Sequence, residues 1–367
     1  MKITIATGIY PPDIGGPATF LREFVPVLKK NGWTVDIITY GEPRKDVVAI
    51  SRDNPVKWWS FYRAVRKSAR DADVIFATDT FSAGLPAALA AKNLKKRLVT
   101  RFVGDSAWEI ARSNGWTEDP FELFQKKKYD FKIELLRKCQ RFVLRKSDII
   151  TVGHFLESVL KKWGFKSTVI PNAVSPVKLP VRNVLRKKFG FDKHFVILSA
   201  GRITKYKGID KIIRMCAQFR KEISDLLLVV VGDGPALADA QKAAHEENIT
   251  HIVHFEGRKN ENETRALMKA ADVLVLNSEY EGMSHTLLEA MSVECPVVAS
   301  SVCGNPELVK NRGLLFEYNN MNDLKECILK YYKDPSLAKK FIAKSKQLPS
   351  REEVDKKYLA FLKANTL

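Results

Sequence analysis

The sequence predicts an α/β fold in which two domains each contain a parallel β-sheet. Short apolar strands alternate with helical stretches along the whole chain, a pattern that is typical of βαβ units. The length of 367 residues exceeds what a single hydrophobic core usually serves. A segment with Pro171, Pro176 and Pro180 separates two series of such units, because prolines cannot continue a helix or a central strand.

The first series occupies residues 1–174 and the second occupies residues 175–349. The first is expected to form strands at 3–6, 35–39, 74–77, 98–101, 149–152 and 168–170, with helices such as 18–30 and 126–146 between them. The second is expected to form strands at 195–199, 226–231, 252–255, 273–276 and 297–299. Ser350 as N-cap, with Glu353 as its capping-box partner, predicts a last helix over about 350–364.

Composition excludes several classes of protein. Five scattered cysteines without a Cys-x-x-Cys spacing argue against a disulfide framework and a thiolate zinc site. No apolar run reaches the roughly 20 residues that span a bilayer. The N-terminal residues lead directly into an apolar strand and do not resemble a signal peptide, so we expect a cytoplasmic location.

The chain is strongly basic, with a formal net charge of +19. Residues 1–170 hold 30 Lys and Arg against 18 Asp and Glu, a net charge of +12, and the remaining residues hold 31 against 24, a net charge of +7. Such an excess fits a nucleic acid, an anionic membrane surface or a diphosphate-bearing substrate as a neighbour. It equally fits a surface that is simply highly soluble.

The strongest motif lies at residues 281–291, with the sequence EGMSHTLLEAM, and follows a predicted strand. Gly282 permits a close backbone turn, and Ser284 is a suitable N-cap for the helix that begins there. The amides at such a helix start can bind phosphate. Glu281 and Glu289 stand about two turns apart, so one carboxylate can meet each end of a ligand whose phosphates lie between them.

A second motif, GRITKYKG at residues 201–208, follows the first strand of the second series. The guanidinium of Arg202 and the ammonium of Lys207 suit a diphosphate leaving group. Both cations would stabilise the negative charge that grows as a bond to that group breaks.

These motifs resemble those of glycosyltransferase family 4, whose members carry E-G-(F/M)-(G/S)-x-x-x-x-E-A-M and G-R-x-x-x-x-K-G in the same order. The resemblance extends over nearly the whole chain and implies the GT-B architecture, two Rossmann-like domains facing a central cleft, with the C-terminal helix packed on the N-terminal domain. It implies donor-sugar contact for Glu281, ribose binding for Glu289 and diphosphate binding for Arg202 and Lys207. The remaining donor-binding positions that it implies are Gly282, Met283, Ser284, Thr286 and Leu287.

A glycine loop in the first domain joins the first strand to the first helix. Gly15 and Gly16 allow close backbone approach to a ligand, and Pro17 suits a first helical turn. The loop is similar to the family's glycine loop, which faces the donor phosphates and the acceptor. Residues 170–174 likewise resemble the family's interdomain P-N-G-V-D segment, although Ala173 and Ser175 differ from it.

The N-terminal domain departs from the family pattern after its fourth predicted strand, where many members have a histidine. Here residues 100–109 read TRFVGDSAWE, without a histidine. Asp105 is the best-placed substitute for orienting an acceptor hydroxyl or the donor sugar, and Glu109 is the second. Either side chain can alternatively cap or start the next helix. A phosphate oxygen of the donor can accept the acceptor's proton in retaining enzymes of this type, so a protein base is not required.

We expect neither a metal ion nor a cofactor beyond the nucleotide-diphosphate sugar, which acts as co-substrate. Asp71 and Asp73 match an acidic D-x-D pattern, but they precede a strand, whereas metal-binding aspartates of this kind follow one. Residues 231–237, VGDGPAL, contain only two of three dinucleotide-binding glycines, and the chain has no Gly-Lys-Ser/Thr P-loop.

Residues 126–146 form the most basic stretch, with nine Lys and Arg against two acids and with apolar residues at helical spacing. It could contact an anionic membrane at the inner membrane face, or it could have one face in the core and one in water. With the family resemblance, the sequence predicts a metal-independent, retaining hexosyltransferase acting on a glycan or lipid-linked glycan, with no nucleic-acid partner. The alternatives are an epimerase or phosphorylase of the same fold, and a polyanion- or membrane-binding protein that is not an enzyme.

Overall fold

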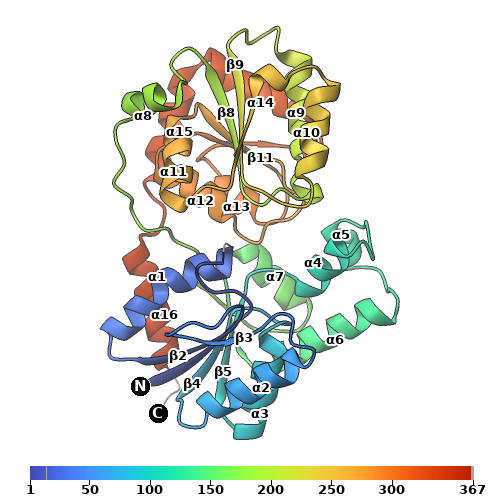
Figure 1. Ribbon diagram of the computed structural model, residues 1–367, viewed down its shortest axis with the longest axis vertical. Helices are drawn as coiled ribbons and strands as arrows, with labels where there is room; N and C mark the ends of the chain where they lie inside the picture. Colours follow the sequence, from blue (N-terminus) through green and yellow to red (C-terminus); the bar gives the residue numbers. More distant parts are fainter. Residues whose placement is uncertain (14, 365–367) are drawn as a thin grey trace. The chain divides into compact units, whose positions relative to one another are not determined.

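The computed structural model describes residues 1–13 and 15–364, and the chain forms two compact units. Unit 1 comprises Met1–Asn172 together with the segment that starts at Arg351, and unit 2 comprises Ala173–Ser350. The last helix therefore belongs to the same unit as the first strand, as the red and blue ribbons of Figure 1 show.

Unit 1 contains a parallel sheet, and its described residues form seven strands. Their order is β3 (Val48–Ile50), β2 (Thr34–Tyr40), β1 (Lys2–Thr7), β4 (Val74–Ala77), β5 (Arg97–Phe102), β6 (Asp148–Thr151) and β7 (Thr168–Val169). β1 pairs with both β2 and β4, so the order of strands reverses between β1 and β4. Loops that follow β1 and β4 thus leave the sheet on either side of this reversal.

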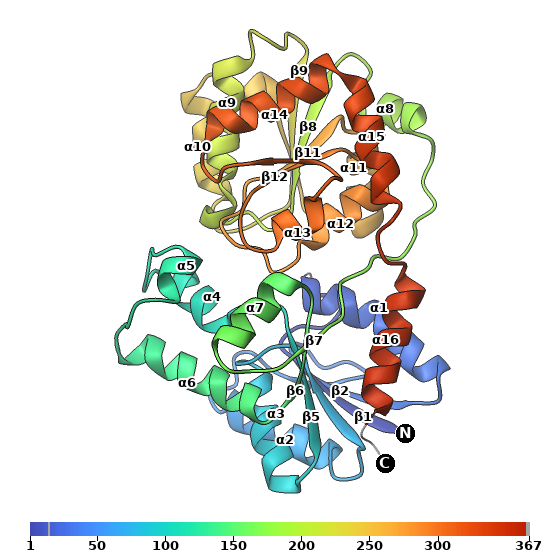
Figure 2. The ribbon, with the colours of Figure 1, turned by 180° about the vertical axis from the view of Figure 1, so that it is seen from behind.

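Two layers of helices cover this sheet. On one face lie α1 (Gly16–Lys30) and α16 (Arg351–Lys363), and on the other lie α2 (Lys57–Ser68), α3 (Gly84–Leu94) and α6 (Phe131–Arg145) (Figures 1 and 2). Under the second layer, Phe61, Ala87 and Val143 from α2, α3 and α6 join one buried cluster with the strands. The shorter helices of this unit are α4 (Ser106–Ser113), α5 (Phe121–Phe124) and α7 (His154–Lys162).

Helix α16 is held on unit 1 by aromatic packing and a buried arginine. The ring of Tyr358 lies 5.0 Å from that of Phe20 and 5.2 Å from that of Phe24, both on α1. Arg101, only 1% exposed at the end of β5, donates a hydrogen bond of 3.0 Å from Nε to Tyr358 Oη. Its guanidinium also lies over the Phe20 ring and donates to Oδ1 of Asn172. Arg101 thus contacts Asn172, where the chain leaves unit 1, and Tyr358 on the helix with which it returns.

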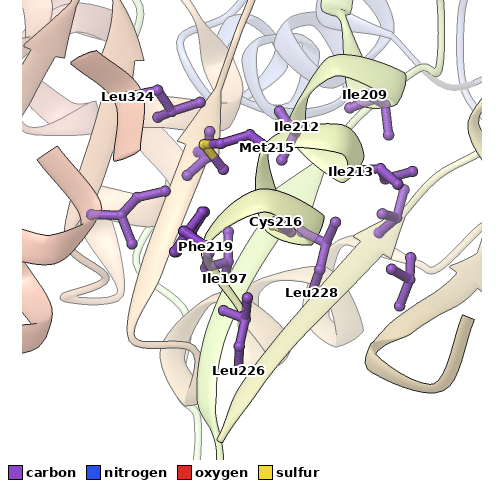
Figure 3. Close-up of a cluster of buried hydrophobic side chains, with 14 of the residues drawn as sticks. Ile197, Ile209, Ile212, Ile213, Met215, Cys216, Phe219, Leu226, Leu228 and Leu324 are labelled. Carbon is purple, nitrogen blue, oxygen red and sulfur yellow. The ribbon is translucent and has the colours of Figure 1, made fainter. Parts of the chain in front are cut away.

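The described residues of unit 2 form a six-stranded parallel sheet. The strand order is β10 (Val253–Gly257), β9 (Leu226–Val231), β8 (Phe195–Ala200), β11 (Val273–Leu276), β12 (Val297–Ser300) and β13 (Leu314–Phe316). β9 and β11 are buried along their whole length, as strands covered on both faces must be. Figure 3 shows one side of the core, where Ile212, Cys216 and Phe219 of α9 (Ile209–Phe219) pack on Ile197 and Leu228.

The other helices of unit 2 alternate with its strands along the chain. They are α8 (Arg182–Phe189), α10 (Leu237–Glu246), α11 (Glu261–Ala270), α12 (His285–Ser292), α13 (Asn305–Val309), α14 (Met321–Lys333) and α15 (Pro335–Ser345). The predicted α/β class with two parallel sheets is confirmed. The sequence interpretation missed two strands, β3 and β13, each of which is three residues long and lies at a sheet edge.

We expect the Tyr358→Ala variant to lose about 3–5 kcal/mol of stability in unit 1, the usual cost of removing a large buried aromatic side chain. All six tryptophans lie in residues 33–163, so tryptophan fluorescence during urea unfolding reports on unit 1 alone. Lys357→Ala, an exposed position on the same helix, is the matched control and should be nearly neutral. Equal midpoints for the two variants would show that α16 does not stabilise unit 1.

Candidate functional site

Both ligand-binding motifs of the second domain lie at the carboxyl edge of the unit 2 sheet. Residues 201–208 follow β8, and residues 277–284 follow β11. These strands are neighbours, and the strand order reverses between them. Loops at such a reversal diverge and leave a crevice, which is where open α/β sheets bind ligands.

The loop after β8 depends on two glycines. Gly201 has a φ of 128°, and Gly208 has a φ of 57°, both in the region that glycine adopts readily. Residues Lys205–Lys207 form a short 3-10 turn, η1, and Gly208 then leads into α9. A Cβ on Gly208 would lie 2.4 Å from Nδ2 of Asn277, so only a glycine lets this loop pack directly on the end of β11.

The two loops are joined by a pair of opposite charges. Lys207 Nζ forms an ion pair with Oε1 of Glu281, and the side chains are 17% and 15% exposed. Ser278 Oγ donates a hydrogen bond of 3.0 Å to the same carboxylate oxygen. A backbone bond of 2.8 Å from the amide of Glu279 to the carbonyl of Tyr206 lies beside the pair. The cation and the anion that the sequence assigns to diphosphate and sugar are therefore in contact within one unit.

Helix α12 begins where the sequence predicts. Ser284 is its N-cap, and its Oγ accepts a hydrogen bond of 3.4 Å from the amide of Leu287. Leu287 itself is fully buried, so its side chain belongs to the core, and its amide is already used by the cap. Thr286 lies near the β8 loop, because its Oγ1 is 3.7 Å from where a Cβ on Gly201 would stand. The helix start and the β8 loop thus approach each other.

Close contacts between backbones hold the neighbouring loops in place. A Cβ on Gly304, in the loop after β12, would lie 1.9 Å from the carbonyl oxygen of Gly282. The amide of Gly304 donates a bond of 2.9 Å to the carbonyl of Glu281. On the other side, a Cβ on Gly232 would lie 1.9 Å from the carbonyl oxygen of Gly201. These distances leave no room for any side chain at Gly232 or Gly304.

A small pocket opens between the two loops. Its lining includes Arg202, Lys207 and Asn277, together with the ends of β8 and β11. Asn277 is 1% exposed, and within residues 1–13 and 15–364 its Oδ1 has no hydrogen-bond donor. A buried acceptor without a donor is unfavourable, so this atom suits a ligand hydroxyl or N–H. The sequence interpretation did not identify Asn277, although an amide directly after a buried strand is a usable signal.

Two further predicted residues differ in their surroundings. Arg202 is exposed, and no hydrogen bond or ion pair connects it with another residue in the described part of the chain. Glu289 lies on the second turn of α12 and is half-buried. Met283, in the loop before this helix, is also half-buried. The structure therefore places Arg202, Lys207, Glu281 and the start of α12 together, with Glu289 farther along the helix.

In unit 1, the glycine loop forms the start of α1. Gly15 precedes this helix with a φ of 154°, and a Cβ there would lie 2.6 Å from Cδ1 of Ile9. Gly16 is the first helical residue. An ion pair of 2.6 Å between Arg52 and Asp13 ties this loop to the segment that follows β3. Both glycines thus follow β1, beside the strand reversal of unit 1.

The structure shows the helix-capping alternative for Asp105. It is the N-cap of α4, and Oδ1 accepts bonds from the amides of Ala107 and Trp108 at 3.0 and 3.2 Å. Gln140 donates to Oδ1 at 3.0 Å, and Gln125 donates to Oδ2 at 2.8 Å. The carboxylate is 1% exposed, and these hydrogen bonds hold it at the helix start.

The acidic pair Asp71 and Asp73 also has structural partners. Asp71 forms an ion pair of 2.9 Å with Lys2 Nζ, and Asp73 accepts a bond of 2.7 Å from the Lys2 amide. They lie at the amino end of β4, away from the carboxyl edge. Within the described residues no three His, Cys, Asp or Glu side chains come together as a metal-binding cluster would require.

Comparison with known proteins agrees with this geometry. A family model for glycosyl transferases group 1 matches residues 181–348, and one for glycosyltransferase family 4 matches residues 14–178. An uncharacterised glycosyltransferase of Methanocaldococcus jannaschii is 28% identical, covering 85% of this chain and 83% of its own length. The α-monoglucosyldiacylglycerol synthase of Streptococcus pneumoniae is also 28% identical, covering 90% and 78%.

Solved structures share the fold. The Anabaena protein HepE, in complex with UDP and glucose, superposes with a TM-score of 0.80 at 17% identity and with 99% of both chains covered. WaaG, a glycosyltransferase involved in lipopolysaccharide biosynthesis, has a TM-score of 0.77 at 17% identity, covering 99% of this chain and all of its own. Both are GT-B structures, and the predicted GT-B class is confirmed.

We expect the Gly304→Ala variant to displace the turn at Gly282, because the new methyl group would overlap a carbonyl oxygen. Overpacking of this kind costs about 1–3 kcal/mol. Hydrogen exchange followed by mass spectrometry should therefore show faster exchange in peptides that cover residues 279–290. Ser301→Ala, at an exposed position of the same loop, is the control. Unchanged exchange in both variants would contradict the proposed packing.

Proposed function

Because the chain belongs to the group 1 glycosyltransferases of the GT-B type, we propose that it transfers a hexosyl group from a nucleotide-diphosphate sugar to an acceptor hydroxyl, with retention of anomeric configuration. The observation that carries this proposal is the contact between Lys207 and Glu281 at the strand reversal, beside the guanidinium of Arg202, which has no ion pair within the described residues. The two cations suit the anionic end of a nucleotide-diphosphate sugar, and the carboxylate suits its hydroxyl-rich end.

In the proposed reaction the bond between the anomeric carbon and the β-phosphate oxygen breaks, and the acceptor oxygen bonds to the same face of that carbon. The acceptor's proton passes to an oxygen of the departing diphosphate. Arg202 and Lys207 stabilise the negative charge that develops on this diphosphate, so they lower the energy of the transition state more than that of the bound donor. Because the chain supplies both cations, the proposal requires no divalent metal.

The ion pair has a further role in this proposal. With donor bound, the diphosphate offers Lys207 a second anionic partner, and the Glu281 carboxylate then accepts hydrogen bonds from the sugar hydroxyls. Ser278 would keep that carboxylate oriented through its 3.0 Å hydrogen bond. Glu289 would bind the ribose hydroxyls from the second turn of α12, and the amide of Thr286 would face the phosphates. Gly15 and Gly16 are likewise proposed to bind the donor phosphates.

The acceptor is proposed to be a glycan or a lipid-linked glycan. Relatives support a lipid acceptor: one is named for the synthesis of monoglucosyldiacylglycerol, and a Corynebacterium glutamicum relative is named a phosphatidylinositol monomannoside mannosyltransferase. In residues 1–13 and 15–364, none of the helices is both long and apolar enough to cross a membrane. We propose a cytoplasmic location with access to the inner face of a membrane.

We expect Arg202→Ala and Glu281→Gln each to lower kcat by a factor of about 100 or more, the usual effect of removing one group that stabilises transition-state charge. Lys205→Ala, an exposed cation in the same loop, is the matched control and should retain most activity. Transfer would be assayed with the donor identified by binding. Folded variants with wild-type turnover would overturn the site assignment, and donor consumption without any acceptor would indicate an epimerase instead.

The donor base can be identified by thermal shift against UDP, GDP, ADP, dTDP and their sugar conjugates, without added metal. A nucleotide at about 100 times its dissociation constant should raise the free energy of unfolding by about 2.7 kcal/mol. One nucleotide family should stabilise the wild type and not the Glu289→Ala variant. No shift with any nucleotide in a folded sample would contradict the proposed donor class.

A further inference from the structure

Asn277 is a buried amide side chain between the two loops of the candidate site. It follows β11 directly and lines the same pocket as Arg202 and Lys207. The other side chains around this pocket are mostly apolar: Ala200, Ile203, Ile209, Val230, Val231 and Leu276. An amide in such surroundings needs hydrogen-bond partners, because a buried polar group without them destabilises the fold.

The orientation of the Asn277 amide is fixed by the loop on which it packs. Its Nδ2 donates a hydrogen bond of 3.5 Å to the carbonyl of Gly208. Exchanging the nitrogen and the oxygen would bring Oδ1 against that carbonyl oxygen, and two acceptors without a proton between them repel each other. Nδ2 therefore belongs to the loop, and Oδ1 is the atom that requires another partner.

Oδ1 of Asn277 is shielded from solvent and accepts no hydrogen bond within the described residues. Its partner must therefore be a donor group that borders the pocket or one that a ligand brings there. Arg202 and Lys207 are the cations of the lining, and Arg202 is exposed. Lys207 directly precedes Gly208, the residue that the Asn277 amide contacts, and its side chain is only 17% exposed. The Lys207 ammonium is thus the better placed of the two donors.

We propose that Asn277 is a positioning residue for Lys207 when a donor diphosphate is bound. Without a ligand the Lys207 ammonium is paired with Oε1 of Glu281. A diphosphate that draws the ammonium away from this carboxylate leaves it beside apolar walls, where a charge needs further polar partners. Oδ1 of Asn277 then accepts a hydrogen bond from Nζ and holds the ammonium toward the diphosphate. An amide oxygen suits this role because it is uncharged and does not repel the phosphates as a second carboxylate would.

This inference rests on the proposed function, because it concerns the protein with a nucleotide diphosphate bound. Its distinctive consequence is a preference for a nucleoside diphosphate over the corresponding monophosphate. The monophosphate lacks the β-phosphate, which is the group on which Lys207 is proposed to act. A substitution that only loosens the fold would weaken the binding of both nucleotides alike.

The test is isothermal titration calorimetry of the full chain with the nucleoside diphosphate and monophosphate of the base that thermal shift identifies. Asn277→Leu keeps the approximate size of the side chain and removes its amide. We expect it to weaken diphosphate binding about tenfold or more, the usual effect of losing a hydrogen bond to a charged group, and to leave monophosphate binding unchanged. Val275→Ala, a buried apolar position on the same strand, is the control for lost stability and should weaken neither.

A double-mutant cycle with Lys207→Met separates positioning from a structural role. In the Lys207→Met background, Asn277→Leu should have no further effect on diphosphate binding. Equal weakening with and without the lysine would overturn the proposal and would give Asn277 a structural role alone.

The nucleotide sugar provides a second comparison. Weaker binding of the nucleotide sugar to Asn277→Leu, with the free diphosphate bound as tightly as by the wild type, would also overturn the proposal. It would assign Oδ1 to a hydroxyl of the donor sugar. Wild-type protein that binds no nucleotide at all would instead overturn the proposed function together with this inference, so the two failures give different results.

Discussion

The candidate site in unit 2 depends on backbone segments that approach each other so closely that only glycine fits between them. The loop after β9 touches the loop after β8 at Gly232, and the loop after β12 touches the loop after β11 at Gly304. At Gly208, whose φ is 57°, a Cβ would instead meet the side-chain amide of Asn277. Four loops that come from separate strands are thereby fixed as one rigid edge, and the position of Lys207 beside Glu281 follows from that packing.

This rigidity matters for the electrostatics of the site. Partly buried charges are costly unless they are paired, and Lys207 and Glu281 satisfy each other while Ser278 supports the carboxylate. Arg202 has no such partner within the described residues, so its charge is available at the rim of the pocket. A ligand with two phosphates can engage Arg202 without breaking any existing contact. In the proposed function, the donor diphosphate would then compete with Glu281 for Lys207.

The sequence was sufficient to predict the two-sheet fold and the start of α12, because long apolar strands and a strand–glycine–N-cap sequence are local signals. β3 and β13 were missed because a three-residue strand at a sheet edge carries little pattern, although the even shorter edge strand β7 lies within a predicted strand. Asp105 shows why site residues are harder to predict than strands. An aspartate after a strand has the same sequence pattern whether it caps a helix or faces a ligand. The hydrogen bonds from Gln125 and Gln140, which are distant in sequence, are visible only in the structure. The contacts of Gly232 and Gly304 are hidden from the sequence for the same reason.

The two helix layers of unit 1 differ in where they place their cations. On the α1–α16 face, Arg101 is buried, and its guanidinium is stabilised by the Phe20 ring, the Tyr358 hydroxyl and the Asn172 side chain. On the α2–α3–α6 face, Arg63, Lys67, Lys138 and Arg141 are exposed, and Glu134 is the single acid within the three helices. Mutual repulsion of these cations slightly opposes folding, and nothing in the core requires them, because Phe61, Ala87 and Val143 fill the inner side. Because the exposed cations of this layer slightly destabilise the fold and are not needed by its core, we infer that they serve to attract an anionic partner.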